Sequence, residues 1–245
     1  MNKITQGMMA AIVAGCFMGN MAQAGNGVYV TGKLGSSIMQ LSDQKWSSEG
    51  GLDGTYHGGN KTKGVFGGGV AIGYDFYDAY SLPIRTEFDI MMRGKASSDY
   101  NLATSSYGTP GTSGYWDSDD AKNDVTLNTF MVNAYYDFRN STAFTPYVSV
   151  GLGMASLKHK AKYEYTEISY PSGSREFDSY SKSKTATNFA WSLGVGTQYS
   201  FNDNLALDLS YRYLDAGKSD VSFIESKSKI KVRTNDIMLG VVYRF

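Results

Sequence analysis

The sequence has 245 residues, of which 23 are basic, 23 are acidic and 14% are aromatic. This balance excludes a strongly basic protein of the kind that binds nucleic acid, and charge alone indicates no other partner. Mean hydropathy is −0.31, and beyond the N-terminal residues no apolar run reaches the roughly 20 residues that a transmembrane helix requires.

The first 24 residues predict a secretory signal peptide. Lys3 precedes an apolar run over residues 8–18, and Ala22 and Ala24 form a small-x-small cleavage signature. We expect cleavage after Ala24, which leaves residues 25–245 as one domain without a cysteine, and therefore without a disulfide or a cysteine metal site. The alternative is lipidation of Cys16, because residues 13–16 (VAGC) resemble a lipobox.

Eight segments after the signal alternate apolar and polar residues with period 2, which predicts eight β-strands. They cover residues 28–40, 63–76, 83–95, 125–138, 146–157, 188–201, 205–214 and 232–245. One face of each strand carries large apolar side chains and no charge, whereas the other face carries Gly, Ser, Asn and charged residues. A midplane charge on a lipid-facing surface is costly, so the apolar face is the expected lipid face of a transmembrane β-barrel.

A Tyr-x-Phe pair ends every second strand, at residues 74–76, 136–138, 199–201 and 243–245. The connections after the first three pairs are short, whereas the opposite connections (41–62, 96–124, 158–187 and 215–231) are long. This asymmetry is typical of outer-membrane barrels. We therefore predict an all-β fold, an eight-stranded antiparallel transmembrane β-barrel with short periplasmic turns and four long extracellular loops. A soluble sandwich or lipocalin-like barrel is the alternative, but it needs the apolar face inside.

Several strand motifs resemble those of the opacity-protein (Opa) and OmpA-like eight-stranded outer-membrane barrels. They are residues 29–35 (YVTGKLG), 73–76 (GYDF), 135–138 (YYDF), 211–217 (YRYLDAG) and 243–245 (YRF). The resemblance covers most of the barrel and none of the long connections. It implies a bacterial outer-membrane protein used in adhesion, invasion or immune evasion, although some members are mainly structural.

Charged residues on the polar face are expected to meet inside the barrel. Those near mid-barrel are Lys33, Arg85, Glu87, Asp89, Arg93, Asp208 and Arg212, with Asp75, Asp137 and Arg244 nearer the periplasm. Opposite charges in a narrow interior must pair or stay hydrated, which predicts a salt-bridged network that holds the barrel together. The resemblance to OmpA-like barrels implies that Lys33 faces Glu87. A gated conduit is the alternative, but eight strands leave space for little more than side chains.

The last strand places four residues at alternating positions: Leu239, Val241, Tyr243 and Phe245. The resemblance implies that they form the signal recognised by the outer-membrane assembly machinery. They are also the expected lipid face of that strand, and both roles are compatible.

Two rows of cations alternate along extended segments. They are Lys158, Lys160 and Lys162, and Lys227, Lys229, Lys231 and Arg233. Their phase places them on the outward face just above the lipid. A regular row of cations suits a sulfated glycan such as heparan sulfate on a host cell, and the resemblance to heparin-binding invasins favours this interpretation. Contact with phosphates of lipopolysaccharide, or a merely solvated rim, is the alternative.

Catalytic and metal sites are not indicated. The two histidines of the mature chain, His57 and His159, are expected to be exposed in loops, without a neighbouring nucleophile. The acidic segment from Asp117 to Asp124 lacks the spacing of an EF-hand and is expected to be solvated. We therefore predict a surface adhesin or invasin that binds host cells through its loops, without cofactor, metal or enzymatic activity. A structural protein or narrow channel, and less favourably a lipid-modifying enzyme, are the alternatives.

Overall fold

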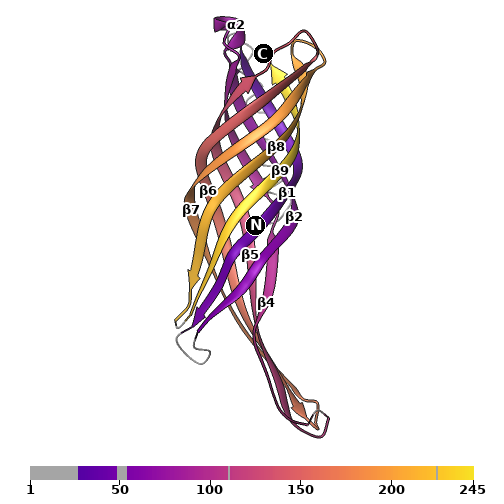
Figure 1. The fold of residues 1–245 in the computed structure, drawn as a ribbon, viewed down its shortest axis with the longest axis vertical. Coiled ribbons are helices and arrows are strands. Elements are labelled where there is room, and N and C mark those ends of the chain that lie inside the picture. The colour runs from indigo at the N-terminus through magenta and orange to yellow at the C-terminus, as the bar shows by residue number, and fades with distance from the viewer. Residues whose placement is uncertain (1–26, 49–53, 110, 225) are drawn as a thin grey trace.

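The computed structural model describes residues 27–48, 54–109, 111–224 and 226–245 (Figure 1). The predicted signal peptide, residues 1–24, lies outside this range. The described elements are β1 (Val28–Ser48), β2 (Gly54–Asp75), α2 (Tyr77–Tyr80), β3 (Ile84–Arg93), β4 (Ala96–Thr109), β5 (Ser113–Asp137), β6 (Phe144–Tyr170), β7 (Arg175–Ser200), β8 (Leu205–Ser222) and β9 (Ser226–Arg244).

The strands form one closed antiparallel ring. Their order is β3-β2-β1-β9-β8-β7-β6-β5-β4, and β3 also pairs with β5. Both β3 and β4 pair with β5, and Gly94 and Lys95 lie between them, so that β3 and β4 are two halves of one interrupted strand. The ring therefore has eight strands, as predicted. None of the helices in the described part of the chain is long and apolar enough to cross a membrane.

The lipid face also agrees with the prediction. Leu34, Phe66, Val150, Leu193 and Leu239 are each more than half exposed on the outer surface of the barrel. The two aromatic rings of each Tyr-x-Phe pair contact one another edge to face at the periplasmic end, with centroids 4.8 to 5.2 Å apart. The barrel is thus apolar outside and carries aromatic residues at its periplasmic rim, as a membrane-spanning barrel requires.

The described parts of the four long connections are mostly strands rather than irregular loops. β6 has 27 residues and β7 has 26, and they stay paired to the Ile168–Arg175 end of the hairpin. Outward apolar residues end near the membrane border because the outer face of each strand meets water instead of lipid above it. Backbone pairing continues nevertheless, since it satisfies the N–H and C=O groups that face a neighbouring strand.

Above the barrel the ring separates into two sheets. β2 pairs with β3 only as far as Gly67 and Arg93, and β7 pairs with β8 only as far as Trp191 and Asp215. β8, β9, β1 and β2 continue as one sheet, here called the short sheet, and β4, β5, β6 and β7 continue as the long sheet. In Figure 1 the long sheet projects well beyond the short sheet, away from α2 and the C-terminus.

Two apolar clusters lie between the sheets, although the sequence pattern predicted a polar interior. The lower cluster, here called the apolar layer, contains Met39, Leu41, Leu127, Leu157 and Val232, all fully buried. The upper cluster surrounds Trp46, which packs on Phe223 and Tyr163. Facing sheets pack through apolar inner surfaces, so the interior becomes sandwich-like where the ring opens.

Candidate functional site

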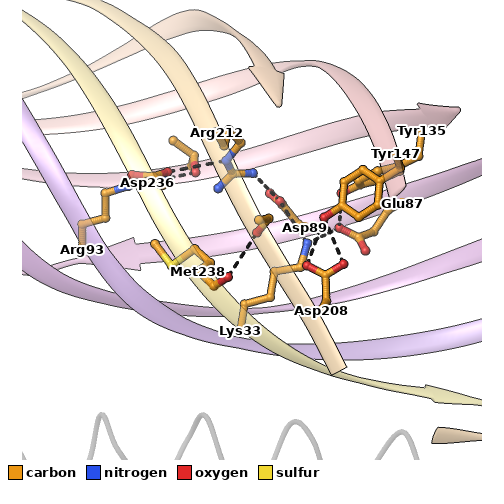
Figure 2. A network of polar contacts seen from close by, with 12 residues as sticks. Lys33, Glu87, Asp89, Arg93, Tyr135, Tyr147, Asp208, Arg212, Asp236 and Met238 are labelled. Carbon is orange, nitrogen blue, oxygen red and sulfur yellow. Dashed lines mark hydrogen bonds and ion pairs between the residues drawn. The ribbon is translucent and has the colours of Figure 1, made fainter. Parts of the chain in front are cut away.

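The interior of the barrel contains the predicted charge network (Figure 2). Lys33 pairs with Glu87, and its Nζ lies 3.7 Å from an oxygen of Asp89. Arg212 binds the same Asp89 at 2.6 Å. These side chains come from β1, β3 and β8, so the ion pairs cross the barrel rather than follow one strand. The predicted pairing of Lys33 with Glu87 is confirmed.

Asp236 is a central member of this network that was not predicted from the sequence. It binds Arg93 at 2.6 Å and lies 3.5 Å from Arg212, and it is fully buried. Its position, next to the outward Ile237, already implied an inward side chain. Tyrosines were missed too, because their hydroxyl groups are invisible to charge counting: Tyr135 donates a hydrogen bond to Glu87 at 2.9 Å, and Tyr147 donates to Asp208.

Arg85 closes the network towards the periplasm. Its guanidinium group makes two hydrogen bonds to Asp137, at 2.8 and 2.9 Å. The rings of Tyr29, Tyr135 and Tyr147 surround it, with centroids 4.6 to 5.7 Å from its Cζ atom. A buried cation with a bidentate carboxylate and aromatic faces around it is well stabilised. The geometry thus suits a structural core that joins the strands.

The first predicted basic row lies on β6, above the lipid-facing surface. Lys158 and Lys160 are exposed and point outward, and neither makes an ion pair within the described ranges. Lys162 is partly covered and binds Glu164 at 2.5 Å. Lys122 of β5 lies directly opposite Lys162; it was missed because only the register of the extended hairpin brings it there. Lys122, Lys158, Lys160 and Lys162 are here called the β6 row.

The second predicted row, on β9, also points outward, but neighbouring acids of β8 neutralise it. Lys231 and Arg233 bind Asp215 at 3.1 and 3.2 Å. Lys227 binds Asp220 at 3.0 Å, and its hydrogen bond lowers the pKa of Asp220. Lys229, directly opposite Lys45 of β1, is exposed. More cations of the β9 row than of the β6 row therefore form ion pairs, although Asp124 lies directly opposite Lys160 and Asp99 directly opposite Lys122.

The two rows do not form a single site. β7 and β8 lie between β6 and β9 in the ring, so the rows occupy different sides of the extension. Lys184 of β7 lies opposite the inward-facing His159 and 3.7 Å from Asp220. It therefore adds to neither outward row.

The prediction for His159 was wrong, whereas His57 is exposed as expected. His159 is fully buried between Leu157 and Ala161, and its Nε2 lies 2.9 Å from Asn123 Oδ1. Burial lowers the pKa of His159 to about 4, although Asp220 opposes the shift. Lys158 and Lys160, its neighbours in the strand, point outward, so the side chain between them has to point inward.

A polar layer surrounds His159 and joins the two sheets. Asn123 of the long sheet accepts a hydrogen bond from Ser228 of the short sheet at 3.1 Å and donates one to Gln44 at 3.3 Å. Ser98 also donates to Gln44, at 2.9 Å. His159, Asn123, Ser228, Gln44 and Ser98 are here called the His159 layer.

The acidic segment of β5 is not uniformly solvated, which corrects another expectation. Asp117 and Asp119 are only 8% and 6% exposed. They face the interior side of the long sheet, whereas Asp120 and Asp124 face outward, because neighbouring residues of a strand alternate. Within the part of the chain that the structure describes, no group of three or more His, Cys, Asp or Glu residues could hold a metal ion.

The residues of the expected assembly signal lie on the lipid side of β9. Leu239, Val241 and Tyr243 are exposed there, and Phe245 contacts the ring of Tyr243 with centroids 5.1 Å apart. The position agrees with the lipid-facing role, and recognition by the assembly machinery stays a prediction.

Barrel closure, the lipid-facing outer surface and the polar lumen define the class: the chain is a bacterial outer-membrane β-barrel. It belongs to the outer membrane protein beta-barrel domain family, which it matches over residues 8–245. Among relatives, outer membrane protein PagN of Salmonella typhimurium is 39% identical over 234 residues, which cover 91% of this chain and 92% of PagN. An uncharacterized Brucella suis protein is 28% identical and covers 77% of this chain and 67% of its own length.

A Rickettsia bellii relative, whose name describes it as a candidate adhesin, is 28% identical over 99 residues. The match covers 40% of this chain and 41% of the relative. Of the solved structures, Neisserial surface protein A has a TM-score of 0.46 and 18% identity, and covers 89% of this chain and 97% of its own. Ail of Yersinia pestis in complex with the heparin analogue sucrose octasulfate has a TM-score of 0.31 and 12% identity, and the match covers 86% of this chain and 99% of Ail.

Proposed function

We propose that this protein is a surface adhesin of the invasin type, which binds sulfated glycans on host cells through the extracellular extension of the barrel. The observation that carries the proposal is the β6 row. Lys158 and Lys160 are exposed cations without a bound carboxylate within the described ranges, on a rigid paired strand just above the lipid. The adhesin name of the Rickettsia relative supports the class of function.

The spacing of the β6 row suits a linear polyanion. Alternate residues of a strand lie about 7 Å apart, so Lys158, Lys160 and Lys162 present a regular line of positive charge. Lys122 widens the line on the neighbouring strand. Such exposed interactions are screened by salt over about 10 Å at 0.1 M ionic strength, so binding should weaken as salt increases.

Lipopolysaccharide is the competing ligand for the same lysines. Its phosphates lie at the height where the apolar surface of the barrel ends, and they offer the same chemistry as sulfate. Outer-membrane lipids and lipopolysaccharide are proposed partners of the barrel in either case.

The test replaces Lys122, Lys158 and Lys160 by Gln and compares this variant with a matched triple variant of Lys227, Lys229 and Lys231. Purified protein in zwitterionic nanodiscs is titrated with heparin at low and at physiological salt. The proposal expects the β6 variant to lose about tenfold in affinity and the β9 variant to lose much less. Equal losses in both variants, or no salt dependence, would contradict it.

A parallel titration with purified lipid A separates the two ligands. If the β6 variant loses lipid A binding while its heparin binding is unchanged, the row serves lipopolysaccharide and the glycan proposal fails. Adhesion of whole cells that express each variant to host cells, with and without enzymatic removal of sulfated glycans, then tests the biological role.

We propose no channel and no enzymatic activity. The apolar layer fills the interior above the charge network, which supports a barrel without a continuous water path. His159, which a hydrolase would use as a base, lies buried beside Asn123, and this position supports a structural role for it.

The lipid-facing residues Leu239, Val241, Tyr243 and Phe245 are proposed as the signal for the outer-membrane assembly machinery. Replacing Phe245 by Ser should lower the amount of folded protein in the outer membrane, measured by heat modifiability on gels. Normal amounts of folded protein would exclude the terminal Phe from that signal.

A further inference from the structure

The inner face of the long sheet has an uncovered part near its tip. The short sheet ends at Ser48 and Ser222, whereas β6 continues to Tyr170 and β7 starts at Arg175. Figure 1 shows the β4–β5 and β6–β7 hairpins projecting alone beyond that point. Within the described ranges, no strand lies opposite this part of the sheet.

Carboxylates line up across this face. Asp117 of β5 lies directly opposite Glu167 of β6, which lies directly opposite Glu176 of β7. One step towards the barrel, Asp119 and Asp178 flank Tyr165 in the same manner. Directly opposed residues of antiparallel strands point to the same side, and like charges in such pairs are destabilising. The five carboxylates are here called the acidic face.

Asp117 supplies a second, independent observation. Its side chain is only 8% exposed, and its Oδ1 atom has no hydrogen-bond donor among the residues that the structure describes. Its neighbours differ: Glu167 accepts hydrogen bonds from Tyr165 at 2.7 Å and Ser169 at 3.1 Å. A buried acceptor without a donor costs about 1–3 kcal/mol, and more when it is charged. A donor from outside the chain would remove this cost.

Two acids on the opposite face of the same sheet have partners. Asp120 and Glu164 are also directly opposed. However, Glu164 binds Lys162 at 2.5 Å, and Asp120 accepts hydrogen bonds from Asn101 at 3.2 Å and Ser118 at 3.1 Å. Within the described ranges, no carboxylate of the acidic face forms an ion pair, whereas Glu164 on the outer face does.

Aromatic side chains border the acidic face. Tyr107 and Tyr115 stack at the tip with ring centroids 6.2 Å apart, and they are 72% and 42% exposed. Tyrosine faces attract ammonium and guanidinium groups. Carboxylates and exposed tyrosines together thus favour a cationic ligand.

We propose that the acidic face docks a lysine- or arginine-rich segment of a partner protein. The carboxylate rows lie about 7 Å apart along each strand, and the strands are about 4.8 Å apart. This spacing matches alternate side chains of an extended basic segment. A donor from that segment would reach Asp117, and the partner would neutralise the repulsion between Asp117, Glu167 and Glu176. The inference is independent of the glycan proposal, because a polyanion would be repelled from this face.

The experiment uses the full chain in zwitterionic nanodiscs and a short fluorescent peptide of alternating lysine and serine as the probe. The inner variant carries Asp117→Asn, Glu167→Gln and Glu176→Gln. The control variant carries Asp99→Asn, Asp120→Asn and Glu164→Gln, which remove the same charge from the outer face. Fluorescence anisotropy gives the affinity of the peptide, and circular dichroism and heat modifiability verify folding.

We expect saturable binding to the unchanged protein, a loss of about tenfold in the inner variant and little change in the control. If the inner variant fails to fold, the single Asp117→Asn variant, which keeps the side-chain shape, takes its place. Absence of peptide binding, or equal losses in both variants, overturns the proposal. Calcium chloride and spermine are titrated in place of the peptide to test small cations. If either one binds saturably and the peptide does not bind, the ligand of the acidic face is a small cation and the proposed protein partner is overturned.

Discussion

Acidification should loosen the contact between the long and the short sheet, because His159 is held neutral inside it. Its Nε2 group donates to Asn123 Oδ1 at 2.9 Å, whereas Nδ1 has no partner within the described ranges. Burial lowers the pKa of His159 from 6.5 to about 4, against a smaller opposing effect of Asp220. A proton on Nδ1 would place a charge between two apolar clusters.

The magnitude follows from the difference between the two protonation equilibria. When the sheets open locally, His159 meets water and takes up a proton near pH 6.5, whereas the closed form does so only near pH 4. The stabilisation of the closed form is therefore complete above pH 6.5 and decreases as the pH falls towards 4. Each pH unit in that window costs about 1.4 kcal/mol, which gives about 3 kcal/mol at the lower end.

Hydrogen exchange of the full protein in detergent, compared at several pH values after correction for intrinsic rates, measures this opening. Amides of β6 around His159 should lose protection between neutral pH and pH 4, and those near Tyr147 should not. The matched variant is His159→Gln, whose amide nitrogen can still donate to Asn123 but does not titrate. Its protection should change much less with pH. If both proteins respond to pH equally, the buried histidine is not the cause and the reasoning is refuted.

Three further predictions concern the barrel. Asp236→Asn leaves the buried Arg93 guanidinium group without its carboxylate partner, whereas Arg212 keeps Asp89. The substitution should cost about 3–5 kcal/mol in urea unfolding, and an unchanged midpoint would contradict the role of the network. Gly153→Ala should lower the free energy of unfolding by about 1–3 kcal/mol, because the new Cβ would lie 2.1 Å from a backbone oxygen. Gly32→Ala is the control and should leave the stability unchanged, because a Cβ there would have no atom within 4 Å. Replacing Leu127 and Leu157 by Ser should permit steady ion conductance in planar bilayers. If the unchanged protein conducts equally well, the apolar layer does not block ions.

Sequence alternation predicted those parts of the molecule in which lipid meets one face of a strand. There, hydrocarbon selects apolar residues so strictly that strand phase and the inward positions of Lys33 and Glu87 followed. The pairing of Lys33 with Glu87 was implied by the resemblance to OmpA-like barrels. Above the membrane this selection ends. The extended hairpins and the long sheet arise from backbone pairing, as does the register that places Lys122 beside Lys162. Backbone pairing leaves no apolar pattern on the outer face, which is the face that the sequence pattern had followed within the membrane.

The error at His159 has a related cause. Residue type suggested an exposed loop histidine, whereas the phase of the neighbouring lysines implied a buried side chain. Phase was the stronger signal, because a strand cannot turn one residue outward without moving both neighbours. Asp236 was missed for the same reason: the assignment of Ile237 to the lipid face already placed its neighbour in the lumen.

The same alternation explains how one sheet can carry two opposite charge patterns. Lys162 faces outward and Glu167 faces inward on β6, so the β6 row and the acidic face share a strand but lie on opposite sides of a paired backbone. Neither pattern can neutralise the other without breaking strand pairing. Because the His159 layer and the charge network hold the base of the long sheet on the barrel, both faces keep a fixed orientation to the membrane. The two proposals together therefore predict that an anionic ligand near the lipid and a cationic segment near the tip can be bound at the same time.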